Sequence, residues 1–227
     1  MRKHSAGMLV AAAGLAMLGT LPARAANKGF YFTGGSGIAE EDPGKSIGLN
    51  IAFGPPPASV VHYEPDSVAV DGNDLGWGVG VGYRFSRYFS AEVEYVDYAT
   101  TDYSEQYTVD FPPLPPTLTK DYTSHVSGPS ASVLGTFPVG KGFEIYIRAG
   151  ALFADRKIDI PGLLYVDGDL DTTFSDTVWL AGIGVDWSFA ERWGIRLEYQ
   201  QSDEMDANLL TGGAAVQAFL LRARFSL

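Results

Sequence analysis

The side chains best suited to catalysis lie in one short segment of the chain. His125 has Ser124 and Ser127 beside it and Asp121 a few residues upstream. Serine, histidine and aspartate are the residue types of a nucleophilic hydrolase, in which the histidine takes the proton of the serine hydroxyl. No motif identifies one serine as the nucleophile, and the chain has no cysteine to replace it. We therefore rank an enzyme acting on lipid below the non-catalytic functions, and we assign no catalytic residue.

The acidic stretch Asp167-Gly168-Asp169-Leu170-Asp171 invites comparison with calcium-binding loops. Calcium takes several oxygen ligands, mostly carboxylates, from one tight loop. This stretch lacks the spacing and the closing glutamate of an EF-hand, so an ordinary solvated loop is the better interpretation. We expect neither a metal nor a cofactor.

A second set of charged residues recurs at every other position of otherwise apolar segments. Glu92 and Glu94, for example, alternate with Val93 and Tyr95, which is typical of a strand with two unlike faces. Arginine binds a carboxylate through two parallel hydrogen bonds, so a narrow interior can pair every charge of such a set. Pairing of this kind explains the two glutamates better than general acid–base catalysis does. We predict a lumen ion-pair network of five arginines and five acids: Arg84, Glu92, Glu94, Glu144, Arg148, Asp186, Arg196, Glu198, Arg222 and Arg224.

The elements that must hold these charges are strands, because alternation with a period of two extends along most of the chain. The segments number eight, and a closed antiparallel barrel requires an even number. Short turns alternate with long polar connections, as in outer-membrane barrels with short periplasmic turns and long extracellular loops. The predicted fold is an all-β, eight-stranded, antiparallel, up-and-down transmembrane barrel. The strands are expected at 29–37, 75–85, 89–95, 130–137, 143–153, 181–189, 193–200 and 219–227, and the long loops near 39–73, 103–124, 159–173 and 203–213.

Alternation would also suit a soluble lipocalin-like barrel, but the aromatic residues favour a membrane. They bracket the short turns and recur on the apolar face about ten residues away, as Phe153 does from Phe143. Ten residues rising ~3.3 Å each and tilted by ~40° span roughly 25 Å, the height of a lipid-facing band. Glycines on the polar face leave room for long side chains. The predicted aromatic girdle comprises Trp77, Tyr83, Phe85, Phe89, Phe137, Phe143, Phe153, Trp179, Trp187, Phe189, Trp193 and Phe225.

The first 25 residues have the pattern of an export signal. Basic residues at the start precede an uncharged apolar run from Met8 to Leu21, and Ala23-Arg24-Ala25 supplies a cleavage pattern. We therefore expect residues 1–25 to be a cleaved signal peptide and residues 26–227 to form one barrel domain in the outer membrane. Removal of three bases and no acid would change the formal charge from −11 to −14. So acidic a chain is a poor binder of nucleic acid.

Three segments resemble the small outer-membrane β-barrel proteins, which include the OmpA transmembrane domain and opacity-type surface proteins. The segment from Gly76 to Phe85, continued by Ala91 to Tyr95, is similar to their second and third strands. The segment from Trp193 to Tyr199 is similar to their seventh strand, and Phe225-Ser226-Leu227 resembles their terminal assembly strand. The resemblance implies the same fold and recognition of the last strand by the barrel-assembly machinery. Phenylalanine is the common last residue there, whereas here Leu227 is last and Phe225 stands two residues before it on the same face. We expect no counterpart of the peptidoglycan-binding domain of OmpA.

The function expected from these patterns is that of a structural or surface-interaction barrel with a plugged, charge-paired lumen. Eight strands leave an interior that side chains can fill, whereas open porins use 16–18. A narrow gated channel for ions or small solutes is the alternative. The acidic loops would lie among lipopolysaccharide phosphates, where divalent cations could bridge them, although a self-repelling soluble surface is the simpler interpretation. We expect a monomer in contact with lipid and lipopolysaccharide, with an extracellular protein partner possible through the loops.

Overall fold

The computed structural model describes residues 28–43, 49–53, 59–71, 75–110, 116–160, 170–205 and 213–227. The expected signal peptide lies outside these residues. Within the described ranges, no helix has the length and apolar character needed to cross a membrane. The strands are β1 (Gly29–Pro43), β2 (Leu49–Phe53), β3 (Ser59–Tyr63), β4 (Ser67–Asp71), β5 (Leu75–Arg84), β6 (Phe89–Thr108), β7 (Thr117–Gly140), β8 (Phe143–Ile160), β9 (Leu170–Ser188), β10 (Trp193–Ser202) and β11 (Ala214–Ser226).

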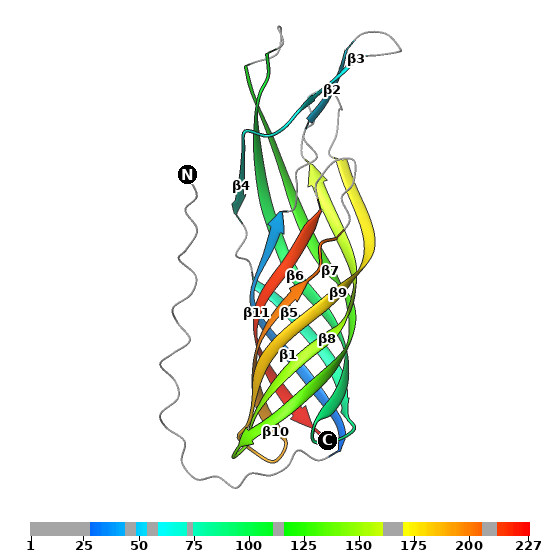
Figure 1. The fold of residues 1–227 in the computed structure, drawn as a ribbon, viewed down its shortest axis with the longest axis vertical. Helices are drawn as coiled ribbons and strands as arrows, with labels where there is room; N and C mark the ends of the chain where they lie inside the picture. Colours follow the sequence, from blue (N-terminus) through cyan, green and yellow to red (C-terminus); the bar gives the residue numbers. More distant parts are fainter. Residues whose placement is uncertain are drawn as a thin grey trace.

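Eight of these strands close into an antiparallel barrel, which confirms the predicted fold class. Around the barrel the order is β1, β5, β6, β7, β8, β9, β10 and β11, and β11 pairs with β1 again. Figure 1 shows the strands winding diagonally around the axis, with the C-terminus at the end that carries the short turns. The last residue joins this closure, since the backbone N–H of Leu227 donates to the carbonyl oxygen of Phe30 at 3.0 Å.

In the part of the barrel near the short turns, the barrel strands turn mostly apolar residues outward and mostly charged and small residues inward. In β10, the exposed Ile195 and Leu197 alternate with the buried Arg196 and Glu198. A soluble barrel would have the opposite arrangement, with an apolar interior throughout and a polar outside. The outward row becomes polar toward the far end of the strands, as Glu40 and Asp42 on β1 show. The apolar band therefore covers only part of the barrel wall.

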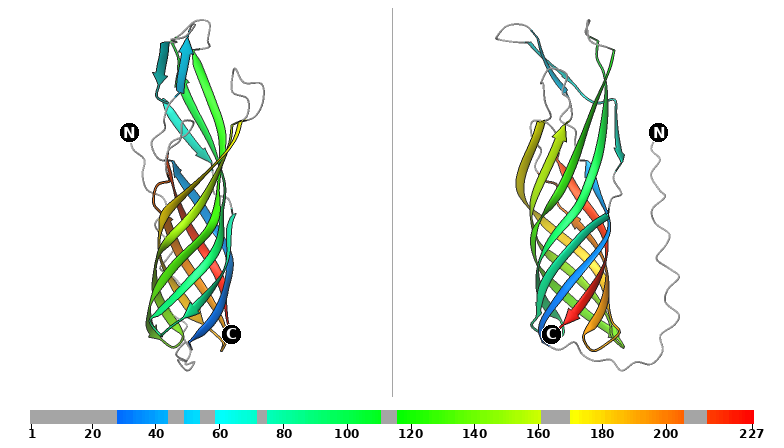
Figure 2. Two further views of the ribbon diagram at one scale, coloured as in Figure 1. Left: turned by 90° about the vertical axis from the view of Figure 1, so that its right-hand side faces the viewer. Right: turned by 180° about the vertical axis from the view of Figure 1, so that it is seen from behind.

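The strands extend well beyond this band, and here the predicted loop boundaries were wrong. The ladder between β6 and β7 continues to Thr108 and Thr117, and the ladder between β8 and β9 continues to Ile160 and Leu170. The expected loop at 103–124 is therefore largely strand, and the expected loop at 159–173 is strand at 159–160 and 170–173, its middle part lying outside the described residues. The expected loop at 39–73 contains the hairpin of β2 and β3 and also β4, which pairs with β6. Figure 2 shows these strands rising as a projection above the barrel.

The side chains that the extended strands turn inward explain why these segments remain in the sheet. Tyr103 on β6 and Tyr122 on β7 are buried and stacked, with ring centroids 4.8 Å apart, beside Ile158 and Ile160 of β8. The outward residues of the same strands are polar because they face water. A polar outer face gave these segments the composition of loops, although their inward face is apolar and holds them in the sheet.

Candidate functional site: a charge-paired barrel interior

Glycines on the inward face create the space in which the interior side chains lie. A Cβ atom at Gly82 on β5 would lie 2.3 Å from the ring of Tyr31, and one at Gly184 on β9 would lie 2.5 Å from the ring of Tyr146. Both distances are far below ordinary contact, so these strands must lack a side chain there. The two tyrosines fill this space and lie against the charged residues.

The end of the barrel near the short turns contains two compact ion pairs. Arg84 on β5 donates two hydrogen bonds to Glu144 on β8, at 2.9 and 2.7 Å. Arg224 on β11 donates two to Asp186 on β9, at 2.8 and 3.0 Å. Arg196 also contacts Asp186, at 3.3 Å. Two parallel bonds from a planar guanidinium fix both distance and orientation, so these pairs tie strands together across the lumen.

Arg148 on β8 is the centre of the network above these pairs. Its guanidinium group bonds to Glu92 and Glu198, each at 2.5 Å, and also to Glu94. Arg196 bonds to Glu92 at 2.6 Å, and Arg222 bonds to Glu94. The side chains of Arg148, Glu92, Glu94 and Glu198 are fully buried. All ten charged residues selected from the sequence thus lie inside the barrel, and each contacts at least one of them that has the opposite charge.

Two tyrosines complete the ionic network, and sequence reasoning missed both. The hydroxyl of Tyr31 donates to Glu92 at 2.7 Å. The guanidinium group of Arg196 lies 4.7 Å from the ring centroid of Tyr146, a distance that permits a cation–π interaction. Tyr146 could have been found, because it shares the inward face of β8 with Arg148. Tyr31 lies in a glycine-rich segment whose two faces the sequence does not distinguish.

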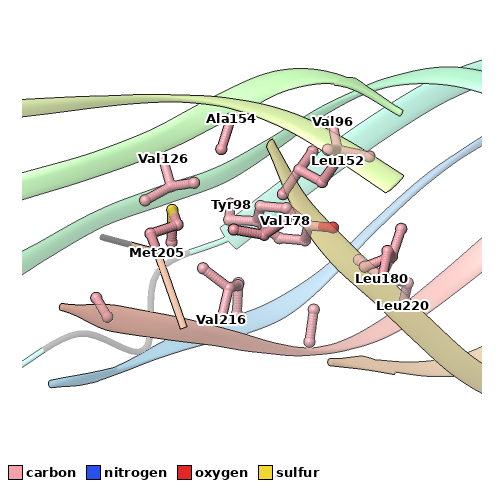
Figure 3. Close-up of a cluster of buried hydrophobic side chains, with 13 residues drawn as sticks. Val96, Tyr98, Val126, Leu152, Ala154, Val178, Leu180, Met205, Val216 and Leu220 are labelled. Atoms are coloured by element: carbon pink, nitrogen blue, oxygen red, sulfur yellow. The ribbon is translucent and has the colours of Figure 1, made fainter. Parts of the chain in front are cut away.

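An apolar layer of buried side chains lies in the lumen beyond the ionic network, and Figure 3 shows how these side chains gather. Tyr98 connects the two layers, since its ring belongs to the apolar cluster and its hydroxyl donates to Gln200 at 3.1 Å. Sequence reasoning missed this layer, although the inward face of β8 continues from Arg148 to Leu152 and Ala154. The layer consists of Ala39, Val96, Tyr98, Val126, Leu152, Ala154, Val178, Leu180, Met205, Ala214, Val216, Ala218 and Leu220.

A further ion pair crosses the lumen beyond the apolar layer. Glu41 on β1 and Arg156 on β8 lie 2.7 Å apart, and β1 and β8 are on opposite sides of the barrel. Ser124 donates to Glu41 at 3.0 Å and accepts from Arg156 at 2.9 Å. Burial raises the pKa of Glu41 above its ordinary value, against the opposing effect of Arg156. Glu41 lies in a segment expected to be an acidic loop, and this expectation is wrong for the residue, because it is buried inside the barrel.

The twelve predicted girdle residues lie on the outer face of the barrel. Several contact one another across neighbouring strands: Phe143 stacks on Trp187 with centroids 5.6 Å apart, and Trp193 lies 4.9 Å from Phe225. Trp179 is strongly exposed on β9. The structure adds Phe30, Tyr199 and Phe219 to the outward aromatic residues of β1, β10 and β11.

The residues that suggested a hydrolase are divided between the two faces of β7. The side chain of Ser124 is buried in the lumen against Glu41, whereas His125 faces outward, 3.5 Å from Asp97 and 3.3 Å from Thr100. Asp121 accepts a hydrogen bond from Ser104. The proposed calcium loop lies mostly outside the described residues, and within the described part of the chain no three carboxylate or histidine side chains form a potential metal site.

Comparison with known proteins agrees with this architecture. Residues 10–218 match the outer membrane protein β-barrel domain family. The chain belongs to this family. Membership assigns it to the outer membrane. No curated protein matches the sequence closely.

Solved structures are similar to this chain at low sequence identity. Neisserial surface protein A has a TM-score of 0.51 and 11% identity, over 87% of this chain and 97% of that protein. OprG from Pseudomonas aeruginosa has a TM-score of 0.48 and 15% identity, over 88% and 98% of the two chains. The attachment invasion locus protein Ail of Yersinia pestis, solved with the heparin analogue sucrose octasulfate, has a TM-score of 0.47 and 14% identity, over 87% and 99%.

Proposed function

We propose that this protein is a structural or surface-interaction barrel of the outer membrane, exported behind a cleaved signal peptide, whose lumen is closed to ions and solutes. The observation that carries the proposal is the central position of Arg148, which bonds to three carboxylates from β6 and β10. The five arginines and five acids balance in charge, so the network carries no net charge that would favour entry of cations or of anions. Function then resides in the projecting strands rather than in the lumen.

The apolar layer supports the closed lumen independently of the ionic network. Leu152 is fully buried and pairs in register with Val178 on β9. Ions lose hydration on entering an apolar constriction, which costs several kcal/mol per charge in a protein environment. A rearranged salt bridge could admit ions into the first layer, but the second layer would still exclude them. The pair of Glu41 and Arg156 adds a single ion pair nearer the mouth, and the closed lumen of this proposal does not depend on it.

Potassium efflux from vesicles containing refolded protein tests this proposal. The native chain, an ionic-layer variant (Arg148→Ser with Glu198→Ser) and an apolar-layer variant (Leu152→Ser with Val178→Ser) are all expected to retain potassium. The variant that combines all four changes is expected to leak. Heat-modifiable mobility on a gel establishes that each variant has folded, and Ala149→Ser with Ala151→Ser on the outer face is the matched control. Steady efflux through the native chain would instead establish the narrow channel as the function.

A further inference from the structure

Above the membrane band, the barrel continues as an open sheet whose first strand is β4. This strand pairs with β6 from Ser67↔Gln106 to Asp71↔Asp102. It lies in line with β5 along the same edge of β6, because β5 begins only at the level of Trp77↔Asp97. A strand has two hydrogen-bonding edges, and within the described residues β4 uses only the one that faces β6. Figure 1 shows β4 on the outer flank of the projection.

The side chains of β4 are exposed, as expected for an edge strand that has a neighbour on one side only. All five residues are exposed, and Val68 and Val70 retain 40% and 38% exposure. In register these valines lie beside Glu105 and Tyr103 of β6, which are almost fully buried on the inward face. One further strand alongside β4 would cover both valines and satisfy the free backbone groups.

The opposite edge of the projecting sheet is different. There β9 extends beyond the end of β10, which pairs with it only as far as Leu180↔Ser202. Its extension has a charged residue, Asp176, at an inward-facing position between Phe174 and Val178. Natural sheets use inward-pointing charges to prevent pairing at exposed edges. In β4 the residues from Ser67 to Val70 are all uncharged, so this edge lacks such protection.

The surroundings of β4 are acidic. Glu64 and Asp66 precede the strand, Asp71 ends it, and Asp102 lies opposite on β6; all four are exposed. The chain as a whole has a formal charge of −11. Complementary charge accelerates association and selects partners at such surfaces. A bound segment would therefore be basic as well as extended.

We propose that β4 is a docking strand that binds an extended, lysine- or arginine-rich segment of an extracellular protein by β-strand addition. Backbone hydrogen bonds to the free edge would provide affinity, and alternate apolar side chains of the partner would cover Val68 and Val70. This inference deepens the surface-interaction part of the proposed function and is independent of whether the lumen conducts.

The test uses the full chain refolded in lipid nanodiscs and a fluorescein-labelled peptide with a Val-Thr-Val centre between lysine pairs. Fluorescence anisotropy measures binding of this peptide and of a version methylated at alternate backbone nitrogens, which keeps the charge and removes hydrogen bonds. The key variant is Val68→Asp with Val70→Asp, which adds negative charge but places it where the strand must dock. Thr173→Asp with Thr177→Asp adds the same charge at the β9 edge and is the matched control.

Strand addition predicts that the methylated peptide and the valine variant both weaken binding by about tenfold or more, while the control variant binds like the native chain. Simple charge attraction predicts the reverse for the valine variant, namely tighter binding, and equal affinity for both peptides. Either of those results, or no binding of the unmethylated peptide, would overturn the proposal. Failure of the docking proposal would leave the result of the potassium-efflux assay unchanged, so it can be distinguished from failure of the closed-lumen proposal.

Discussion

Replacement of Arg148 by methionine is the most informative single perturbation of the ionic network. The side chain has no exposed surface and bonds to Glu92, Glu94 and Glu198. Removing one partner of a buried ion pair typically costs about 3–5 kcal/mol, because an uncompensated charge remains. Glu92 keeps Arg196 and Glu94 keeps Arg222, so we expect a loss near the lower end, about 3 kcal/mol.

The measurement is denaturant-induced unfolding of the refolded protein in lipid vesicles, followed by tryptophan fluorescence. All four tryptophans lie on the outer face, so their emission reports contact with lipid directly. The double variant Arg148→Met with Glu198→Gln removes one charge of each sign. We expect it to be more stable than Arg148→Met alone by about 1 kcal/mol or more, because charge balance is restored.

Lys141→Met in the exposed turn between β7 and β8 is the control, and its free energy of unfolding should change by less than about 0.5 kcal/mol. The reasoning is refuted if Arg148→Met unfolds like the control. It is refuted equally if the stability lost by the double variant equals the sum of the losses caused by each change alone, because Arg148 and Glu198 would then not be coupled.

Three further predictions follow from other parts of the molecule. Gly82→Ala should destabilise the barrel by about 1–3 kcal/mol, because the new Cβ forces the ring of Tyr31 aside. Gly34→Ala should not, because its Cβ meets Val79 at an ordinary 3.6 Å. Thermal unfolding of the two variants compares them. Burial raises the pKa of Glu41, so its contribution to stability is fully present below its unfolded pKa of about 4.5 and is lost as pH rises through its folded pKa. The native chain should therefore lose stability relative to Glu41→Gln as pH rises. An opposite slope in unfolding titrations would contradict this. Intact-mass measurement of protein extracted from outer membranes should give a chain beginning at Ala26, give or take a residue, and a mass that retains residues 1–25 would exclude cleavage there.

The barrel was predictable from sequence because its physics is local to each strand. Alternation between apolar and charged residues fixes which face of β10 meets lipid, and aromatic residues beside the turns mark the limits of the band. The charge-bearing residues of the lumen followed from the same alternation. Arg148 was identified as an interior residue without any knowledge of which acid it meets.

The remaining features depend on contacts between distant residues or on a change of solvent along one strand. Glu41 and Arg156 meet only because β1 and β8 lie on opposite sides of a closed barrel, which no local pattern encodes. Beyond the membrane the outer face turns polar, so the ends of β6 and β7 resemble loops in composition. The five-residue strand β4 is short, and only its pairing with β6 distinguishes it from an irregular segment.

Single-channel recording of the native chain in planar bilayers tests the central claim of a closed interior most directly. Protein whose folding has been verified by heat-modifiable mobility should insert without producing steps of current, and Arg148→Glu should be the comparison for any activity observed. Sustained current through the native chain, with an ion selectivity that changes in Arg148→Glu, would contradict the account and identify the lumen as a conducting path.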